Sequence, residues 1–221
     1  MCMMLVACVS VSTGQERTTQ VNQVNQVTSM EIFDKVDVAG AMHVTYVPGD
    51  SCTLLVNAPA DVFEQLTIYV DRGQLHIGTK RQPMLKQALV DFGQAKIHVT
   101  CPMLKSIELT GSGVFVCEHP FTADNLSVEL TGSGTINLSN LTCDQVDTDL
   151  TGSGSVTFGT IHAKRIESDV TGSGSVTYGN AQADYAQSKV TGSGSVSLAG
   201  TVQKHDEQVT GSGSVDTSGL K

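Results

Sequence analysis

The sequence of 221 residues predicts an all-β protein, a right-handed parallel β-helix with coils of about 20 residues. Three observations predict this fold: one tetrapeptide recurs at nearly constant spacing, apolar and polar residues alternate around each copy, and the composition favours a thin core. Glycine occurs 22 times, aromatic residues make up 5% of the chain, and tryptophan is absent. Such a chain suits stacked layers of small and medium apolar side chains.

The tetrapeptide Thr-Gly-Ser-Gly sets the period. Its six copies start at Thr110, Thr131, Thr151, Thr171, Thr191 and Thr210, so the steps are 21, 20, 20, 20 and 19 residues. A period of this size is typical of a solenoid in which each repeat stacks on the next. Glycines at fixed places indicate sharp corners, because glycine accepts positive φ. A helix is excluded, since each glycine would destabilise a helix interior by about 1 kcal/mol.

Residues around each tetrapeptide alternate between apolar and polar. An apolar residue precedes every copy, as Leu150 does, and another follows five residues after the threonine, as Val156 does. This period of two is the signature of a strand with one buried face. Several repeats carry a third apolar patch, such as Ile161. We therefore expect three short strands per coil, with equivalent residues of successive coils about 4.8 Å apart.

One β-helix domain is expected over 31–221, with a decorated N-terminal part at 31–105 and the regular repeats at 106–221. The segment 36–40 aligns in phase with 107–111, so the same coil is expected there. We also expect strands over 54–56, 66–70, 75–77 and 97–99, a turn at 71–73, a helical turn over 60–65, and a helix or covering loop over 83–90. Such decoration could cap one end of the solenoid, whose strand edges would otherwise be unpaired. The last repeats carry no comparable decoration.

The first residues predict export. Met1–Val11 is apolar, and Leu5-Val6-Ala7-Cys8 resembles the lipobox of bacterial lipoproteins, which are lipidated on the cysteine. We expect a signal or lipoprotein-type export segment over 1–14 with lipid attached to Cys8, and a polar tether over 15–30. An ordinary signal remnant is the alternative. The protein would then be periplasmic, anchored to the outer membrane or at the cell surface, and a membrane would be contacted only through the lipid.

Charge and cysteine usage exclude several classes of protein. The formal net charge is −9 with a pI near 5.0, and no long basic run exists, so we expect no nucleic-acid partner. The six cysteines include no Cys-x-x-Cys pair and no histidine at zinc-ligand spacing. A zinc or redox motif is therefore not expected. Disulfides remain open for an exported protein, and the spacing does not show their pairing.

The ordered combination of Phe33–Gly40 (FDKVDVAG), Asp71–Leu75 (DRGQL), Ile97–Pro102 (IHVTCP) and the serial Gly-Ser-Gly repeats resembles the head GIN domain family. Members are also described as putative auto-transporter adhesins. The resemblance covers roughly 31–221. It implies a secreted or envelope-attached bacterial protein with a β-helical body, and it supplies no catalytic residues.

Stacking of the coils turns sequence columns into surface rows. The columns two and four residues before each threonine bring together Asp147, Asp149, Glu167 and Asp169. Calcium prefers several hard oxygen ligands, so these carboxylates are a candidate calcium site. The alternative is a solvated face on which water and salt reduce the repulsion.

A second surface consists of hydroxyl side chains in rows. Its members on three successive coils are Ser155, Thr157, Ser175, Thr177, Ser195 and Ser197. A flat array of this kind could bind a glycan or even ice. The alternative is that these residues are good strand and turn formers that keep a solenoid soluble.

An enzyme is not expected. The histidines are scattered, Gly-x-Ser-x-Gly and phosphate-loop motifs are absent, and four tyrosines without tryptophan offer few platforms for a sugar substrate. The leading interpretation is a non-catalytic envelope or secreted binding and adhesion module without a cofactor, with a glycan or envelope protein as partner. The alternatives are a structural protein that self-associates through exposed coil ends and, more distantly, a β-helical carbohydrate-active enzyme.

Overall fold

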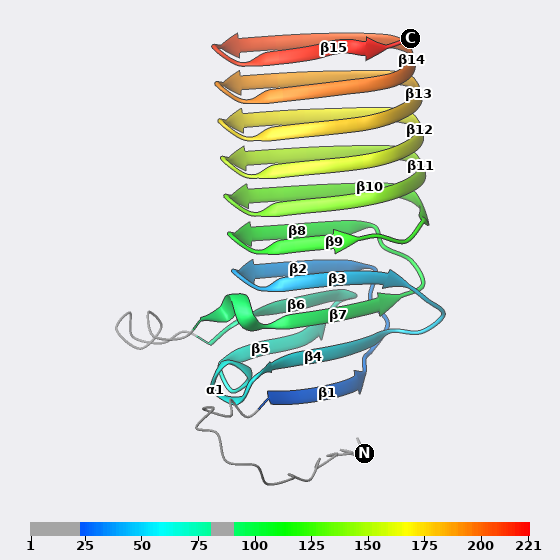
Figure 1. Cartoon of the computed structure of the whole chain (residues 1–221). Helices are drawn as coiled ribbons and strands as arrows, with labels where there is room; N and C mark the ends of the chain where they lie inside the picture. Colours follow the sequence, from blue (N-terminus) through cyan, green and yellow to red (C-terminus); the bar gives the residue numbers. More distant parts are fainter. Residues whose placement is uncertain (1–22, 81–90) are drawn as a thin grey trace, which may run out of the picture.

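The structure is a computed structural model that describes residues 23–80 and 91–221. These residues form a β-solenoid of about 6 turns with coils of about 20 residues, and 76% of the described residues lie in strands. The coils stack into a column, with the N-terminal elements at one end and β15 at the other (Figure 1). The expected fold class is confirmed.

The regular part pairs its strands in parallel, each with the coil before and the coil after it. It consists of β8 (Ser106–Gly111), β9 (Val114–Cys117), β10 (Phe121–Gly132), β11 (Thr135–Gly152), β12 (Ser155–Gly172), β13 (Ser175–Gly192), β14 (Ser195–Gly211) and β15 (Ser214–Leu220). Each strand from β11 to β14 follows almost a whole coil, where we expected three short strands. The alternation of inward and outward side chains shifts twice within β11, between the buried Leu138 and Leu141 and between Cys143 and Val146. Each long strand therefore bends at two places and keeps three straight segments, without a break in the hydrogen-bonded ladder.

The Thr-Gly-Ser-Gly tetrapeptides form the corners of the coils. Gly152 has φ of 121°, and a Cβ atom there would lie 2.4 Å from the carbonyl oxygen of Gly132 on the preceding coil. The amide of Ser153 donates to that same carbonyl at 2.8 Å. Both the backbone conformation and the close approach of successive coils therefore require glycine.

The N-terminal part continues the stack and then changes its pairing. The parallel strands are β2 (Lys35–Gly40), β3 (His43–Pro48), β6 (Gln74–Thr79) and β7 (Lys96–Cys101). Strand β2 pairs with β8, and Gly40 lies opposite Gly111, which confirms the expected alignment. The antiparallel strands at the end of the stack are β1 (Gln23–Ser29), β4 (Thr53–Pro59) and β5 (Leu66–Asp71).

The shorter elements expected in this part are also confirmed. A helix, α1 (Ala60–Phe63), follows β4, and the turn between β5 and β6 has Arg72 and Gly73 at positive φ of 49° and 78°. A turn of 3-10 helix, η1 (Phe92–Gln94), precedes β7, while the segment expected at 83–90 lies outside the described residues. In the two described ranges, no helix is long and apolar enough to cross a membrane.

Strand β1 lies where we expected part of a polar tether. It pairs antiparallel with β4 over its whole length, although its sequence is QVNQVTS and Val27 is 72% exposed. Backbone hydrogen bonds therefore hold this strand more than burial of apolar side chains does, because a strand edge offers donors and acceptors to any sequence. Composition alone could not indicate it.

The core of the regular part contains a polar group among stacked apolar side chains. The rings of Phe158 and Tyr178 stack with centroids 4.8 Å apart. The Tyr178 hydroxyl lies 2.8 Å from Ser168 Oγ and 3.1 Å from Thr148 Oγ1, and all three residues are buried. Burial raises the pKa of Tyr178 to about 12. The hydroxyl is thus protonated at neutral pH and links side chains of three successive coils.

Candidate binding site and surface rows

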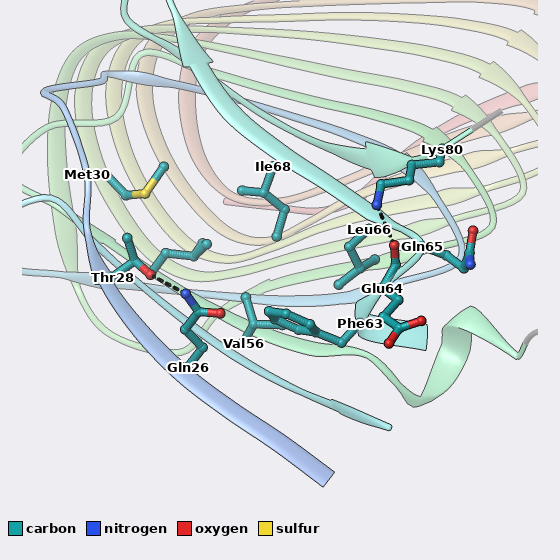
Figure 2. A pocket seen from close by; sticks show the side chains of 11 residues that line it. Gln26, Thr28, Met30, Val56, Phe63, Glu64, Gln65, Leu66, Ile68 and Lys80 are labelled. Carbon is teal, nitrogen blue, oxygen red and sulfur yellow. Dashed lines mark hydrogen bonds between the residues drawn. The ribbon is translucent and has the colours of Figure 1, made fainter. Parts of the chain in front are cut away.

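A pocket opens at the N-terminal end of the solenoid, between the antiparallel strands and α1 (Figure 2). Its volume is about 710 Å³, which is within the range of small-molecule sites. The residues that line it are Gln26, Thr28, Met30, Leu54, Val56, Phe63, Glu64, Gln65, Leu66, Ile68 and Lys80. This pocket was not predicted from the sequence.

Apolar side chains form the wall of the pocket. The alternation of β4 turns Leu54 and Val56 inward, where they are almost completely buried. Leu66 and Ile68 come from β5, and Phe63 from the end of α1. Figure 2 shows Val56, Phe63, Leu66 and Ile68 around one hollow, with Met30 on the far side from Phe63. The wall offers a surface for an apolar ligand group.

Polar groups border the same hollow. The Lys80 ammonium donates to the backbone carbonyl of Glu64 at 2.6 Å, so its position is fixed by the backbone and its charge is not neutralised by that contact. Gln26 Nε2 donates to Thr28 Oγ1 at 3.4 Å on the other side of the pocket (Figure 2). The border of the pocket therefore carries the ammonium of Lys80 and the carboxylate of Glu64 beside an apolar wall, and Lys80 is the group that can contact an anionic end of a ligand.

The acidic columns lie side by side, as expected from the repeat. Asp147 is in register with Glu167, and Asp149 is in register with Asp169. All four line a surface hollow of about 400 Å³. Partial burial, followed by the charges of Asp169 and Asp147, raises the pKa of Asp149.

Neighbouring side chains compensate these carboxylates, and the geometry does not favour a cation. Lys189 Nζ lies 2.6 Å from Asp169 Oδ2, and Arg165 pairs with Glu167. Gln145 Nε2 donates to both oxygens of Asp147, at 2.9 and 3.1 Å. Within 23–80 and 91–221, no group of three or more acidic, histidine or cysteine side chains could hold a metal ion. Calcium binding here is therefore not proposed.

The hydroxyl side chains form two rows across β12, β13 and β14. Ser155, Ser175 and Ser195 are paired in register from coil to coil. Thr157, Thr177 and Ser197 form a parallel row two residues further along each strand. All six are partly exposed, so the rows lie on the outer face as expected.

The cysteines of the described chain are buried and free: Cys52, Cys101, Cys117 and Cys143. Burial raises the pKa of Cys101 and Cys143 to about 12 and that of Cys117 to about 11. A protonated thiol is a poor nucleophile and metal ligand, so these side chains act as core residues. Cys8 lies outside the described residues.

The sequence contained the elements of the pocket but not their arrangement. Leu54, Val56, Leu66 and Ile68 stand in segments expected to be strands. The hollow arises where β1 pairs antiparallel with β4, β5 pairs antiparallel with β6, and α1 follows β4. Pairing direction leaves no periodic signal in a single sequence. The residues of the regular surface rows were found because they recur.

Comparisons with known proteins agree with this architecture. A putative adhesin from Bacteroides fragilis is 21% identical, with a TM-score of 0.73 over 92% of this chain and 100% of that one. A putative lipid binding protein from Parabacteroides distasonis is 18% identical, with a TM-score of 0.72 over 90% and 97%. A putative adhesin from Parabacteroides merdae is 15% identical, with a TM-score of 0.73 over 90% and 97%. At these identities the likeness shows the fold.

A search of curated protein sequences finds no match. The family model described as putative auto-transporter adhesin, head GIN domain, matches residues 32–220, nearly the whole chain. The chain therefore belongs to the head GIN domain family of putative auto-transporter adhesins.

Proposed function

We propose that the protein is a non-catalytic, exported binding module of the bacterial envelope, and that the N-terminal pocket holds its ligand. The observation that carries this proposal is the pocket itself, in which a wall of apolar side chains lies beside the Lys80 ammonium. The family description as an adhesin supports a binding role. The high pKa of the buried thiols fits a chain without a cysteine nucleophile in its described part.

The ligand class that fits the pocket is an amphiphile, with an alkyl chain against Val56, Leu66 and Ile68 and an anionic group near Lys80. Burial of alkyl groups gains about 0.8 kcal/mol for each CH₂, so a short length of chain is enough for binding. The similar fold from Parabacteroides distasonis is described as a putative lipid binding protein, which supports this choice. The corresponding chemistry is a fatty acid or the acyl part of an envelope lipid.

Titration with a fluorescent long-chain fatty acid tests the pocket directly. Ile68→Trp fills the hollow and should weaken binding about tenfold or more, the equivalent of 1.4 kcal/mol. Val27→Trp is the matched control, because Val27 is 72% exposed on β1 and does not line the pocket. A parent protein that does not bind the probe, or an Ile68→Trp variant that binds as well as Val27→Trp, would refute the assignment.

The role of Lys80 is tested separately. Lys80→Met should weaken binding of the fatty acid and leave binding of the matching fatty alcohol unchanged, because only the acid carries a charge. Lys96→Met, at an exposed position of β7, is the control. Equal losses for acid and alcohol would contradict an ion pair between Lys80 and the carboxylate, because methionine keeps the apolar stem and removes only the charge.

Export and lipid attachment are a separate part of the proposal. An adhesin family supports a surface or envelope location, and Cys8 is the residue proposed to carry the lipid. Metabolic labelling with an alkyne fatty acid in a bacterial host should label the parent and spare Cys8→Ser. Labelling of both proteins, or of neither, contradicts lipidation at Cys8.

The hydroxyl rows are the candidate surface for a glycan or an envelope protein, because their register is unbroken over three coils. A glycan array measures this binding without assuming a sugar. We expect any positive glycan to lose affinity when Thr157 and Thr177 are replaced by lysine, whereas Ile68→Trp leaves it unchanged. A silent array would leave the pocket as the ligand site.

A further inference from the structure

The C-terminal end of the solenoid carries one complete coil whose outer edge has no strand beside it within the described chain. This coil runs from Thr201 to Leu220 and comprises the second part of β14 and all of β15. Among the strands of 23–80 and 91–221, β15 pairs only with β14, and the second part of β14 pairs only with β13. The edge therefore presents a row of backbone donors and acceptors to any strand that approaches.

The same coil leaves its inward column partly uncovered. Val209 is 41% exposed, although Val190 and Val170, which precede it in the same column, are fully buried. Val202, Val215 and Leu220 are only partly buried against the core. This surface combines an unpaired strand edge with half-covered apolar residues. A partner coil with the same cross-section would bury the most apolar area and pair the most backbone groups.

The N-terminal end of the solenoid does not have the cross-section of the C-terminal coil. There the antiparallel strands β1, β4 and β5, together with α1, replace the regular coil (Figure 1). A head-to-tail stack would therefore bring together two unlike surfaces. Two C-terminal coils match each other in shape, as a two-fold contact requires.

The charges on the free edge are complementary to themselves. Lys204, His205, Asp206 and Glu207 place two basic side chains before two acidic ones. Lys204 and Asp206 are on the outer face, because both contact Tyr185. Lys204 Nζ lies 5.1 Å from the centroid of that ring, and the Tyr185 hydroxyl donates to Asp206 Oδ2 at 2.9 Å. Within one copy, Lys204 Nζ and Asp206 Oδ2 also form an exposed ion pair, 2.9 Å apart. His205 points inward, with Nε2 at 3.2 Å from Oγ of the buried Ser188.

Antiparallel pairing of this edge with its copy satisfies both charge and side-chain direction. Residues directly opposite in an antiparallel pair point to the same face. With His205 on the two-fold axis, Lys204 lies opposite Asp206 of the second copy, and both face outward. A two-fold axis that crosses the coil meets its opposite side about half a coil after His205, near Val215, which is a partly buried apolar residue. Both strands of the free coil can therefore pair antiparallel with their copies about the same axis.

We propose that two copies of this chain associate through their C-terminal coils, as a two-fold dimer. In this dimer Lys204 of each copy, which lies beside its own Asp206, also pairs with Asp206 of the other copy, so that four alternating charges meet at the axis. Charged residues on an edge strand often prevent such contacts. Charges of one sign on an edge strand repel a second copy of that strand. Here the edge carries both signs, and antiparallel pairing places a basic residue of one copy opposite an acidic residue of the other. The ligand pockets would lie at the two far ends of the dimer, so the association does not depend on pocket binding.

Sedimentation velocity on the full chain, from micromolar to millimolar concentration, tests the dimer. The parent should show a concentration-dependent shift to twice the monomer mass. Lys204→Glu and Asp206→Lys should each weaken association about tenfold or more, because like charges then lie opposite each other. An equimolar mixture of these two variants should recover association, since one variant then supplies only acidic and the other only basic residues at the contact.

Lys164→Glu is the matched control. Lys164 forms a comparable exposed pair with Asp144, at 2.8 Å, but lies on an inner coil, so this variant should associate like the parent. Melting curves of each variant establish that it is folded. A parent that stays monomeric at millimolar concentration overturns the proposal, as does a mixture of Lys204→Glu and Asp206→Lys that associates no better than either variant alone.

Discussion

The regular part of the solenoid and its N-terminal part share one core but differ in how their strands pair. From β8 to β15 every pairing is parallel, and equivalent residues stack in register. Around β1, β4 and β5 the pairing is antiparallel, and the pocket opens there. The repeat gives a uniform column, and the departure from the repeat gives the N-terminal end its pocket.

This difference leads to a prediction about tolerance to substitution. In the inner coils of the repeat, each inward or corner residue lies between its equivalents on the coil before and the coil after, so a substitution changes contacts on both sides. In the N-terminal part, neighbours differ from one another, and the pocket leaves space. Substitutions at similar residues in the two parts should therefore give unequal losses of stability. The difference between the two losses measures how much less the repeat tolerates substitution than the N-terminal part does.

The largest effect is expected at a corner. Gly152→Val should destabilise the fold by about 5 kcal/mol, near the upper end for single substitutions, because its Cβ would approach the Gly132 carbonyl oxygen to 2.4 Å at a φ of 121°. Gly78→Ala in β6 should cost less than about 1 kcal/mol, since its Cβ would make ordinary contacts near 3.9 Å. Urea unfolding measures both. Equal losses would contradict a steric role for the corner glycines.

The next effect concerns aromatic residues. Phe158→Ala should destabilise the protein by about 4 kcal/mol, because the ring is fully buried and stacked on Tyr178. Phe63→Ala should cost about 1 kcal/mol, since that ring is only partly buried beside the pocket. The same unfolding experiment compares them, and fatty-acid binding should change only in Phe63→Ala. A small loss for Phe158→Ala would show that the coils repack freely.

The sequence predicts the structure of the regular repeat better than that of the N-terminal part. The spacing of the tetrapeptides predicts the corners, and the phase of Val36 and Val38 predicts that β2 stacks under β8, as the register confirms. Periodicity carries this information because each coil repeats the same contacts. Strand β1 and the hollow beside Ile68 result from pairings that occur once, so no repetition in the sequence indicates them.

A moderate effect is expected from the buried hydroxyl group. Tyr178→Phe leaves Ser168 Oγ and Thr148 Oγ1 without that partner and should cost about 1.5 kcal/mol. Tyr46→Phe removes one bond, from the Tyr46 hydroxyl to the Cys101 carbonyl at 3.2 Å, and should cost about 0.5 kcal/mol. Thermal melting ranks the two. The reverse order would mean that the hydroxyl link across coils contributes little.

The smallest effect is a pH dependence on the acidic face. The pKa of Asp149 is raised in the folded protein, first by partial burial and then by Asp169 and Asp147. Between its ordinary pKa and the raised value, the folded state binds more protons than the unfolded state, so stability falls as pH rises through this window. At neutral pH the charged carboxylate therefore opposes folding. Asp149→Asn should stabilise the protein there by less than about 1 kcal/mol, because solvent screens much of the repulsion.

The control for Asp149 has the opposite sign. The pKa of Asp216 is lowered, because the hydroxyl and amide of Ser218 donate hydrogen bonds to its carboxylate. Asp216→Asn should therefore lose stability at neutral pH and approach the parent as pH falls. Melting temperatures from pH 2 to pH 7 compare the two variants with the parent, because the stabilisation by Asp216 is lost only below its ordinary pKa of 3.8. If Asp149→Asn also loses stability at pH 7, the carboxylates are held by their basic neighbours strongly enough to favour the fold, and the acidic face stabilises the column rather than straining it.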